Sequence, residues 1–161
     1  MRPRVVVALA AVAVLLRWLM GLWSPLAAFA NPLLAITIVA TLPGRALPAM
    51  GIGIVTGLAQ DVWTGRWIGQ NAFAHLVVAY LLSLVCSRMD MVGWVPAAIA
   101  LLVGSLADWG ILVGLSALFD RRVSGVPGPA AWAIMALVNV AIGLVFFALA
   151  RERSPQKKAR R

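Results

Sequence analysis

The sequence predicts an all-α membrane protein, a bundle of six transmembrane helices in a single integral membrane domain, residues 1–161. Hydrophobic residues make up 63% of the chain, and the mean hydropathy is +0.96. Repeated apolar runs approach 20 residues, the length that crosses a hydrocarbon layer about 30 Å thick. Because no polar connection is long enough to form a separate domain, residues 5–150 are expected to be embedded in the membrane.

The first expected span is Val5–Trp23, whose 19 residues would extend roughly 29 Å as a helix at about 1.5 Å per residue. Arg2 and Arg4 before it and residues 28–30 after it also fit a secretory signal peptide. The run is longer than the usual core of a signal peptide, and five more apolar segments follow. A retained first helix is therefore favoured.

The second expected span, Leu26–Leu42, is interrupted by Asn31 and Pro32. Proline lacks an amide donor and disfavours helix at the preceding residue, so this span should be kinked, or helical only from Pro32. Short connections rich in glycine, proline and charge separate the remaining four spans, which are expected at Leu47–Trp63, Gln70–Ser87, Val92–Phe119 and Ala130–Ala150.

Loop charge predicts the orientation. With the N-terminus in the cytoplasm, the inner segments carry ten Lys and Arg, whereas the outer connections carry three. Because basic residues favour the cytoplasmic side, both termini are expected there. Six of the ten lie in the basic tail, residues 151–161, which is interpreted as a contact with anionic lipid and not with nucleic acid.

Patterns that support catalysis are absent from the sequence. It contains no P-loop, no G-x-S-x-G and no H-E-x-x-H. His75 is the single histidine and Cys86 the single cysteine, so neither a multi-histidine metal site nor an intramolecular disulfide can form. The chain is therefore expected to be non-enzymatic, with no cofactor and no metal.

Small residues recur at helical spacing. Ala49, Gly53 and Gly57 lie four apart, and Gly110 and Gly114 form a second such pair. In lipid, helices associate through close backbone contact, which small residues permit. The Gly53 stripe could dock a partner helix, but internal packing is favoured because six spans need tight seams of their own.

Polar residues inside the spans are costly and usually face one another or a cavity. A proton relay through Asp108, His75 and Asp61 is one interpretation. Hydrogen bonding within the bundle is favoured, with Asp108 paired to Arg17 or His75. The full set is Arg17, Gln60, Asp61, Asn71, His75, Asp108 and Asn139.

The segment Gly51–Leu82 resembles MreD, a small membrane subunit of the bacterial rod-shape system, the elongasome. That family tends to show a glycine-rich helix ending in G-L-x-Q-D, an x-G-x-x-x-G turn, and a helix that runs into A-Y-L. The matching positions here are Gly57, Leu58, Gln60, Asp61, Gly65, Gly69, Ala79, Tyr80 and Leu81, together with Asn31–Leu34 at the opening of the second span.

The resemblance implies a scaffold of the bacterial inner membrane that binds MreC, in a larger complex with MreB, RodA and a class B penicillin-binding protein. It also implies a six-helix bundle similar to the substrate-binding subunits of energy-coupling-factor transporters. The residues considered for partner binding are Gly53, Gly57, Gln60, Asp61, Gly65 and Gly69.

The alternative function is a small-molecule-binding subunit of a vitamin-type transporter, with a pocket lined by Trp67, Asn71, His75 and Asp108. Those transporter subunits commonly carry A-x-x-x-A on the first helix. The alanines of this first span are never four apart, which argues against the alternative.

Overall fold

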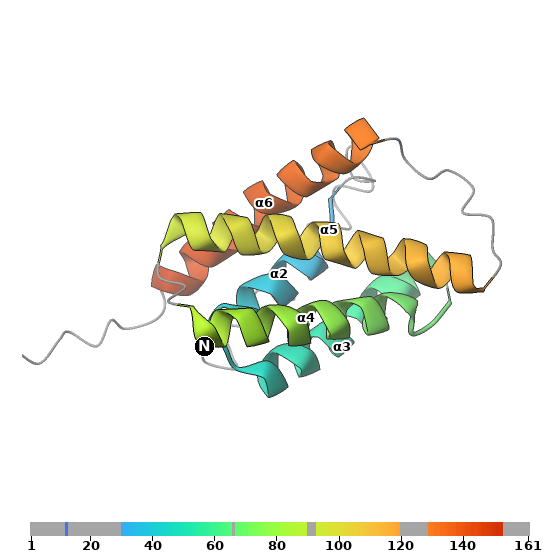
Figure 1. Cartoon of the computed structure of the whole chain (residues 1–161), viewed down its shortest axis with the longest axis horizontal. Helices are drawn as coiled ribbons and strands as arrows, with labels where there is room; N and C mark the ends of the chain where they lie inside the picture. Colours follow the sequence, from blue (N-terminus) through green and yellow to red (C-terminus); the bar gives the residue numbers. More distant parts are fainter. Residues whose placement is uncertain (1–11, 13–29, 66, 90–92, 120–128, 153–161) are drawn as a thin grey trace, which may run out of the picture.

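The computed structural model describes residues 12, 30–65, 67–89, 93–119 and 129–152, and every regular element in these ranges is a helix. The first expected span, apart from the helical Val12, lies outside the described residues, and Arg17 lies outside them with it. Residues 153–161 of the basic tail are also outside. Figure 1 shows the helices in sequence colours, with α2 between the α3–α4 pair and the α5–α6 pair.

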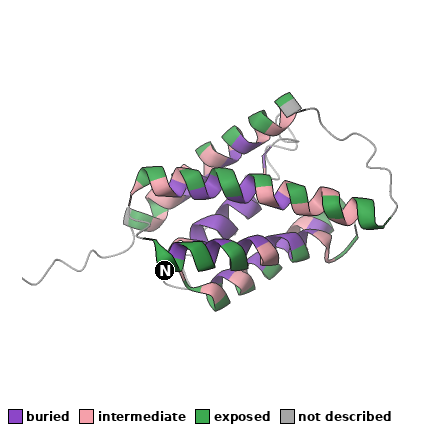
Figure 2. Cartoon of the chain, in the orientation of Figure 1, coloured by how far each residue is buried: buried purple, intermediate pink, exposed green. Residues whose placement is uncertain are grey.

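Helix α2 (Pro32–Thr41) is the centre of the bundle, and all ten of its residues are buried (Figure 2). Asn31 caps it, because its side-chain oxygen accepts from the Leu34 amide at 3.1 Å. Pro32 follows at the first turn, where proline suits a helix start. The helix therefore begins at Pro32. This confirms the expectation that the span is helical only from Pro32. Its ten residues reach about 15 Å, and residues 26–29 of the expected span lie outside the described residues.

Helices α3 (Ala46–Thr64) and α4 (Gln70–Arg88) pack against each other over most of their length. Each begins and ends within one residue of the range expected from the sequence. A short connection joins them, so they form an antiparallel hairpin that covers one side of α2 (Figure 1).

Helices α5 (Trp94–Leu118) and α6 (Pro129–Glu152) form a second pair. Trp94 near the start of α5 meets Phe147 near the end of α6, with ring centroids 5.4 Å apart. Farther along, Trp109 meets Trp132 at 3.7 Å. These two contacts fix an antiparallel arrangement.

Three of the described helices are long and apolar enough to cross a membrane: α4, α5 and residues Ala130–Arg151 of α6. Helix α3 has 19 residues but is not among them, because Gln60, Asp61 and several glycines lower its hydropathy. Large apolar side chains are exposed on the outward faces of α3 to α6, as expected of surfaces that meet lipid: Val55, Val62, Ile99, Val103, Leu137 and Val145.

Candidate functional site

The Gly53 stripe lies inside the hairpin. A Cβ at Gly57 would lie 2.6 Å from the Ala72 nitrogen and closer still to its Cα, and a Cβ at Gly53 would lie 2.9 Å from the His75 carbonyl oxygen. Real Cβ atoms essentially never come within 3.0 Å of another atom, so only glycine fits at either position. The stripe brings the backbones of α3 and α4 together, as the internal-packing interpretation expected.

Asp61 is fully buried where α3 approaches the start of α4. Its Oδ1 accepts from the Asn71 amide at 2.9 Å and from Asn71 Nδ2 at 2.8 Å. Its Oδ2 accepts from the amides of Gly69, at 2.8 Å, and Ala72, at 3.3 Å. A helix start leaves several amides without partners, and a negative charge is favourable there, so Asp61 caps α4 from the neighbouring helix. Gln60 adds only a long bond, Nε2 to Asn71 Oδ1 at 3.5 Å.

The two connection glycines set the geometry of this cap. Gly65 ends α3 with φ of 61°, and Gly69 precedes α4 with φ of 104°. Both values lie in the region that glycine adopts without strain. A Cβ would meet no atom within 4 Å at either residue, so the backbone angle is what requires glycine there. Gly57, Asp61, Gly65 and Gly69 thus build one hairpin.

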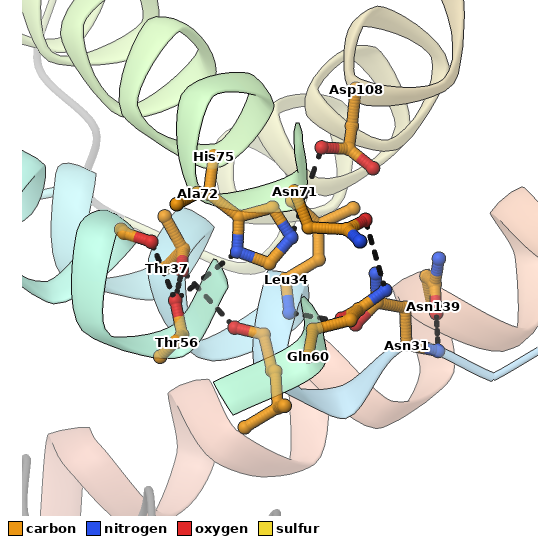
Figure 3. Close-up of polar contacts among 12 residues, drawn as sticks. Asn31, Leu34, Thr37, Thr56, Gln60, Asn71, Ala72, His75, Asp108 and Asn139 are labelled. Atoms are coloured by element: carbon orange, nitrogen blue, oxygen red, sulfur yellow. Dashed lines mark hydrogen bonds and ion pairs between the residues drawn. The ribbon is translucent and has the colours of Figure 1, made fainter. Parts of the chain in front are cut away.

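A second polar group runs across four helices in the interior (Figure 3). Thr37 Oγ1 of α2 lies 2.6 Å from Thr56 Oγ1 of α3, and the same Thr56 oxygen lies 3.2 Å from His75 Nδ1 of α4. On the other edge of the ring, His75 Nε2 lies 3.8 Å from Asp108 Oδ1 of α5. All four residues are buried. We call this group the polar row.

The polar row gives Asp108 one of its two expected partners. Its neighbour is His75, one of the two partners expected, whereas Arg17 lies outside the described residues. Asp61 is not a member of the row, because both of its oxygens are occupied by donors at the start of α4. The relay through Asp61 therefore gains no support from the contacts, and hydrogen bonding within the bundle accounts for Asp61.

The four residues expected to line a transporter pocket have other contacts. Asn71 donates to Asp61, and His75 faces Thr56 and Asp108. Trp67 is 57% exposed and lies against Phe119, with ring centroids 6.2 Å apart. Three of the four are therefore engaged in the interior, and Trp67 lies at the surface.

The sequence did not indicate the contacts of three buried polar residues. Thr37 and Thr56 were not singled out, although a threonine within an apolar helix often bonds the carbonyl three or four residues back, as both do here. Asn139 was identified as an intramembrane polar residue, but its partner was not. Its Oδ1 accepts from the Asn31 amide at 2.7 Å and ties the start of α2 to α6.

Among the described residues, no group of three or more His, Cys, Asp or Glu side chains could hold a metal ion. Comparison with protein-family models, with curated proteins and with solved structures yields no match to this chain.

Proposed function

We propose that this chain is a non-enzymatic scaffold of the MreD type, which binds MreC and helps position cell-wall synthesis in rod-shaped bacteria. The observation that carries the proposal is the hairpin. Four of the residues that resemble MreD in sequence, Gly57, Asp61, Gly65 and Gly69, build one α3–α4 unit.

The proposed setting is the inner membrane, with six spans, both termini in the cytoplasm, and a bundle like that of the energy-coupling-factor subunits. The loop charges support this orientation. The three long apolar helices and the exposed apolar side chains support residence in a membrane. The basic tail would contact anionic lipid, and MreB, RodA and a class B penicillin-binding protein would join through the larger complex.

The face for the partner helix has to lie outside the α3–α4 seam, because α4 already occupies Gly53 and Gly57. Gly110 and Gly114 are the other small pair, on α5. Both are exposed, and a Cβ at either would meet no atom within 4 Å. A single transmembrane helix could approach the α5 backbone closely there, so this pair is the first place to test.

Copurification tests the function. The chain and MreC are expressed together, and MreC retained on the tagged chain is measured after detergent extraction. The wild-type chain should retain MreC in a fixed ratio. Gly110→Leu with Gly114→Leu should lower that ratio, whereas Gly51→Leu, an exposed glycine with equally open space on α3, should not.

A wild-type chain that retains no MreC would refute the proposal. Native mass spectrometry of the same sample gives an independent reading. A stoichiometric small ligand in place of a single-span protein would favour the transporter-type function. If MreC is retained equally by all variants, the function stands and the contact lies on another face.

A further inference from the structure

The inner contact between α4 and α5 pairs an acid with a base through two atoms that have no hydrogen-bond partner. His75 Nε2 and Asp108 Oδ1 are both buried and lack a hydrogen bond to any other described group. They face each other at 3.8 Å, across the interface between the two helices (Figure 3). Buried polar atoms are nearly always hydrogen-bonded, so a buried pair without partners needs an explanation.

The opposite edge of the ring restricts where the His75 proton can be. Thr56 Oγ1 has one hydrogen to donate and can accept two. It lies 2.9 Å from the Ile52 carbonyl oxygen, 2.6 Å from Thr37 Oγ1 and 3.2 Å from His75 Nδ1. Thr37 donates its own hydrogen to the Leu33 carbonyl at 3.1 Å. In the arrangement that satisfies the remaining contacts, Thr56 uses its hydrogen on Ile52 or Thr37 and accepts a hydrogen bond from His75 Nδ1.

In that arrangement Nδ1 carries the hydrogen of a neutral imidazole, and Nε2 is bare. Nε2 and an ionised Asp108 would then present two acceptors to each other, with a net charge of −1 buried in an apolar bundle. Isolated buried charge is strongly unfavourable. One added proton removes both problems, because it places a hydrogen on one of the two atoms, facing the acceptor on the other, and makes the pair electrically neutral.

We propose that His75 and Asp108 form an intramembrane proton-binding site, in which one proton taken from water is carried by His75 Nε2 or Asp108 Oδ1, and the resulting neutral pair joins α4 to α5. Uptake adds one proton and consumes no other reactant. Its release leaves one negative charge at the α4–α5 contact and removes the hydrogen between the two atoms. Packing of α4 on α5 is therefore linked to proton occupancy, whatever partner the bundle binds.

Few charged side chains lie on the helices that pack around His75 and Asp108. On α3, Asp61 is the acidic group whose charge reaches His75, and four donors already neutralise it in part. Helix α2 contributes the uncharged Thr37. Helix α5 has no ionisable residue besides Asp108, and the described part of α6 has none before Arg151. The proton is thus the group available, within the described residues, to balance the pair.

Nuclear magnetic resonance of the ring tests the proposal directly, because His75 is the single histidine of the chain. The full chain is labelled with ¹⁵N-histidine and placed in nanodiscs of zwitterionic phospholipid. The protonation of both ring nitrogens is followed from pH 5 to pH 10. Infrared spectra of the wild type and Asp108→Asn give the protonated-carboxyl band of Asp108 by difference.

Two results at pH 7 support the site, because each shows one more proton on the pair than a neutral ring opposite an ionised Asp108 would carry. Either both ring nitrogens are protonated, or Nδ1 alone is protonated and the Asp108 carboxyl band is present. In both cases the proton should leave in a single step at higher pH that the ring and carboxyl signals share. Asp108→Asn should abolish that step and leave a neutral ring.

A neutral ring opposite an ionised Asp108 at pH 7 would overturn the proposal. This reading uses the wild-type chain alone, so it holds even if Asp108→Asn does not fold. Thr56→Val is the matched control, because it removes the Nδ1 partner at nearly constant volume. It should change the Nδ1 signal and keep the shared step. Loss of the step in a folded Thr56→Val chain would also overturn the assignment to Asp108.

Discussion

Replacing Gly57 by alanine should destabilise the hairpin by a measurable amount. The new Cβ would lie 2.6 Å from the Ala72 nitrogen, and ordinary contact begins at 3.4 Å, so α4 must move by at least 3.4 − 2.6 = 0.8 Å. The obstruction is backbone, which cannot rotate away as a side chain can. Overpacking of this kind costs about 1–3 kcal/mol. The gain in helix propensity from glycine to alanine offsets roughly 0.5–1 kcal/mol in an aqueous helix. A net loss of about 1 kcal/mol, and at most about 2.5 kcal/mol, is expected.

Gly51→Ala is the matched control on the same helix, because a Cβ there would meet no atom within 4 Å. It should leave stability unchanged or raise it by up to about 1 kcal/mol. Gly53→Ala, with a Cβ 2.9 Å from the His75 oxygen, should fall between the two. Cys86, a single buried thiol, supplies the assay through its rate of labelling on heating. If Gly57→Ala unfolds at the same temperature as Gly51→Ala, the close contact between α3 and α4 is refuted.

Three further substitutions, each with a control variant, test the hairpin and the hydrogen bond from Asn31 to Asn139 of α6 by the same thiol assay. Asp61→Asn should cost about 2–3 kcal/mol because an amide group would face amide donors, whereas Gln60→Ala, which loses one 3.5 Å bond, should stay within about 0.5 kcal/mol. Equal losses would contradict the cap. Gly65→Ala should cost about 1–2 kcal/mol from its φ of 61° alone, and Gly65→Asn should cost clearly less. If Gly65→Ala leaves the stability unchanged, the left-handed turn at this residue is refuted. Asn139→Ala should cost about 1–2 kcal/mol by leaving the Asn31 amide without its acceptor. Asn139→Asp keeps an oxygen there and should recover most of this stability. Equal losses in the two variants would refute the bond.

Helix positions could be predicted from the sequence because apolar runs and their breaks are local signals. The ranges expected for the last four spans match α3 to α6 within two residues at each described end. The start of α2 at Pro32 was also predicted, because proline breaks the apolar run there. Hydropathy does not distinguish a helix buried in protein from one that faces lipid, and α2 is apolar because the other helices surround it.

The candidate site was harder to predict than the helices. The residues of the hairpin were all identified, but the role of Asp61 was not, because its partners are backbone amides that no sequence pattern displays. Pairing of His75 with Asp108 was one of two expectations, since spacing along the chain does not say which helices are neighbours. The threonines of the polar row carry no signal beyond their presence in an apolar helix.

Four of the residues that resemble MreD, namely Gly57, Asp61, Gly65 and Gly69, are required by the hairpin itself. Gly57 and Asp61 are buried against α4, so they cannot also touch a second protein. A change there should lower the amount of folded chain and the retained MreC together, and the ratio of the two should stay constant. A change on an exposed face such as Gly110 should lower the ratio while the amount of folded chain is unchanged. The ratio of retained partner to folded chain therefore separates the residues that the fold requires from those that bind the partner.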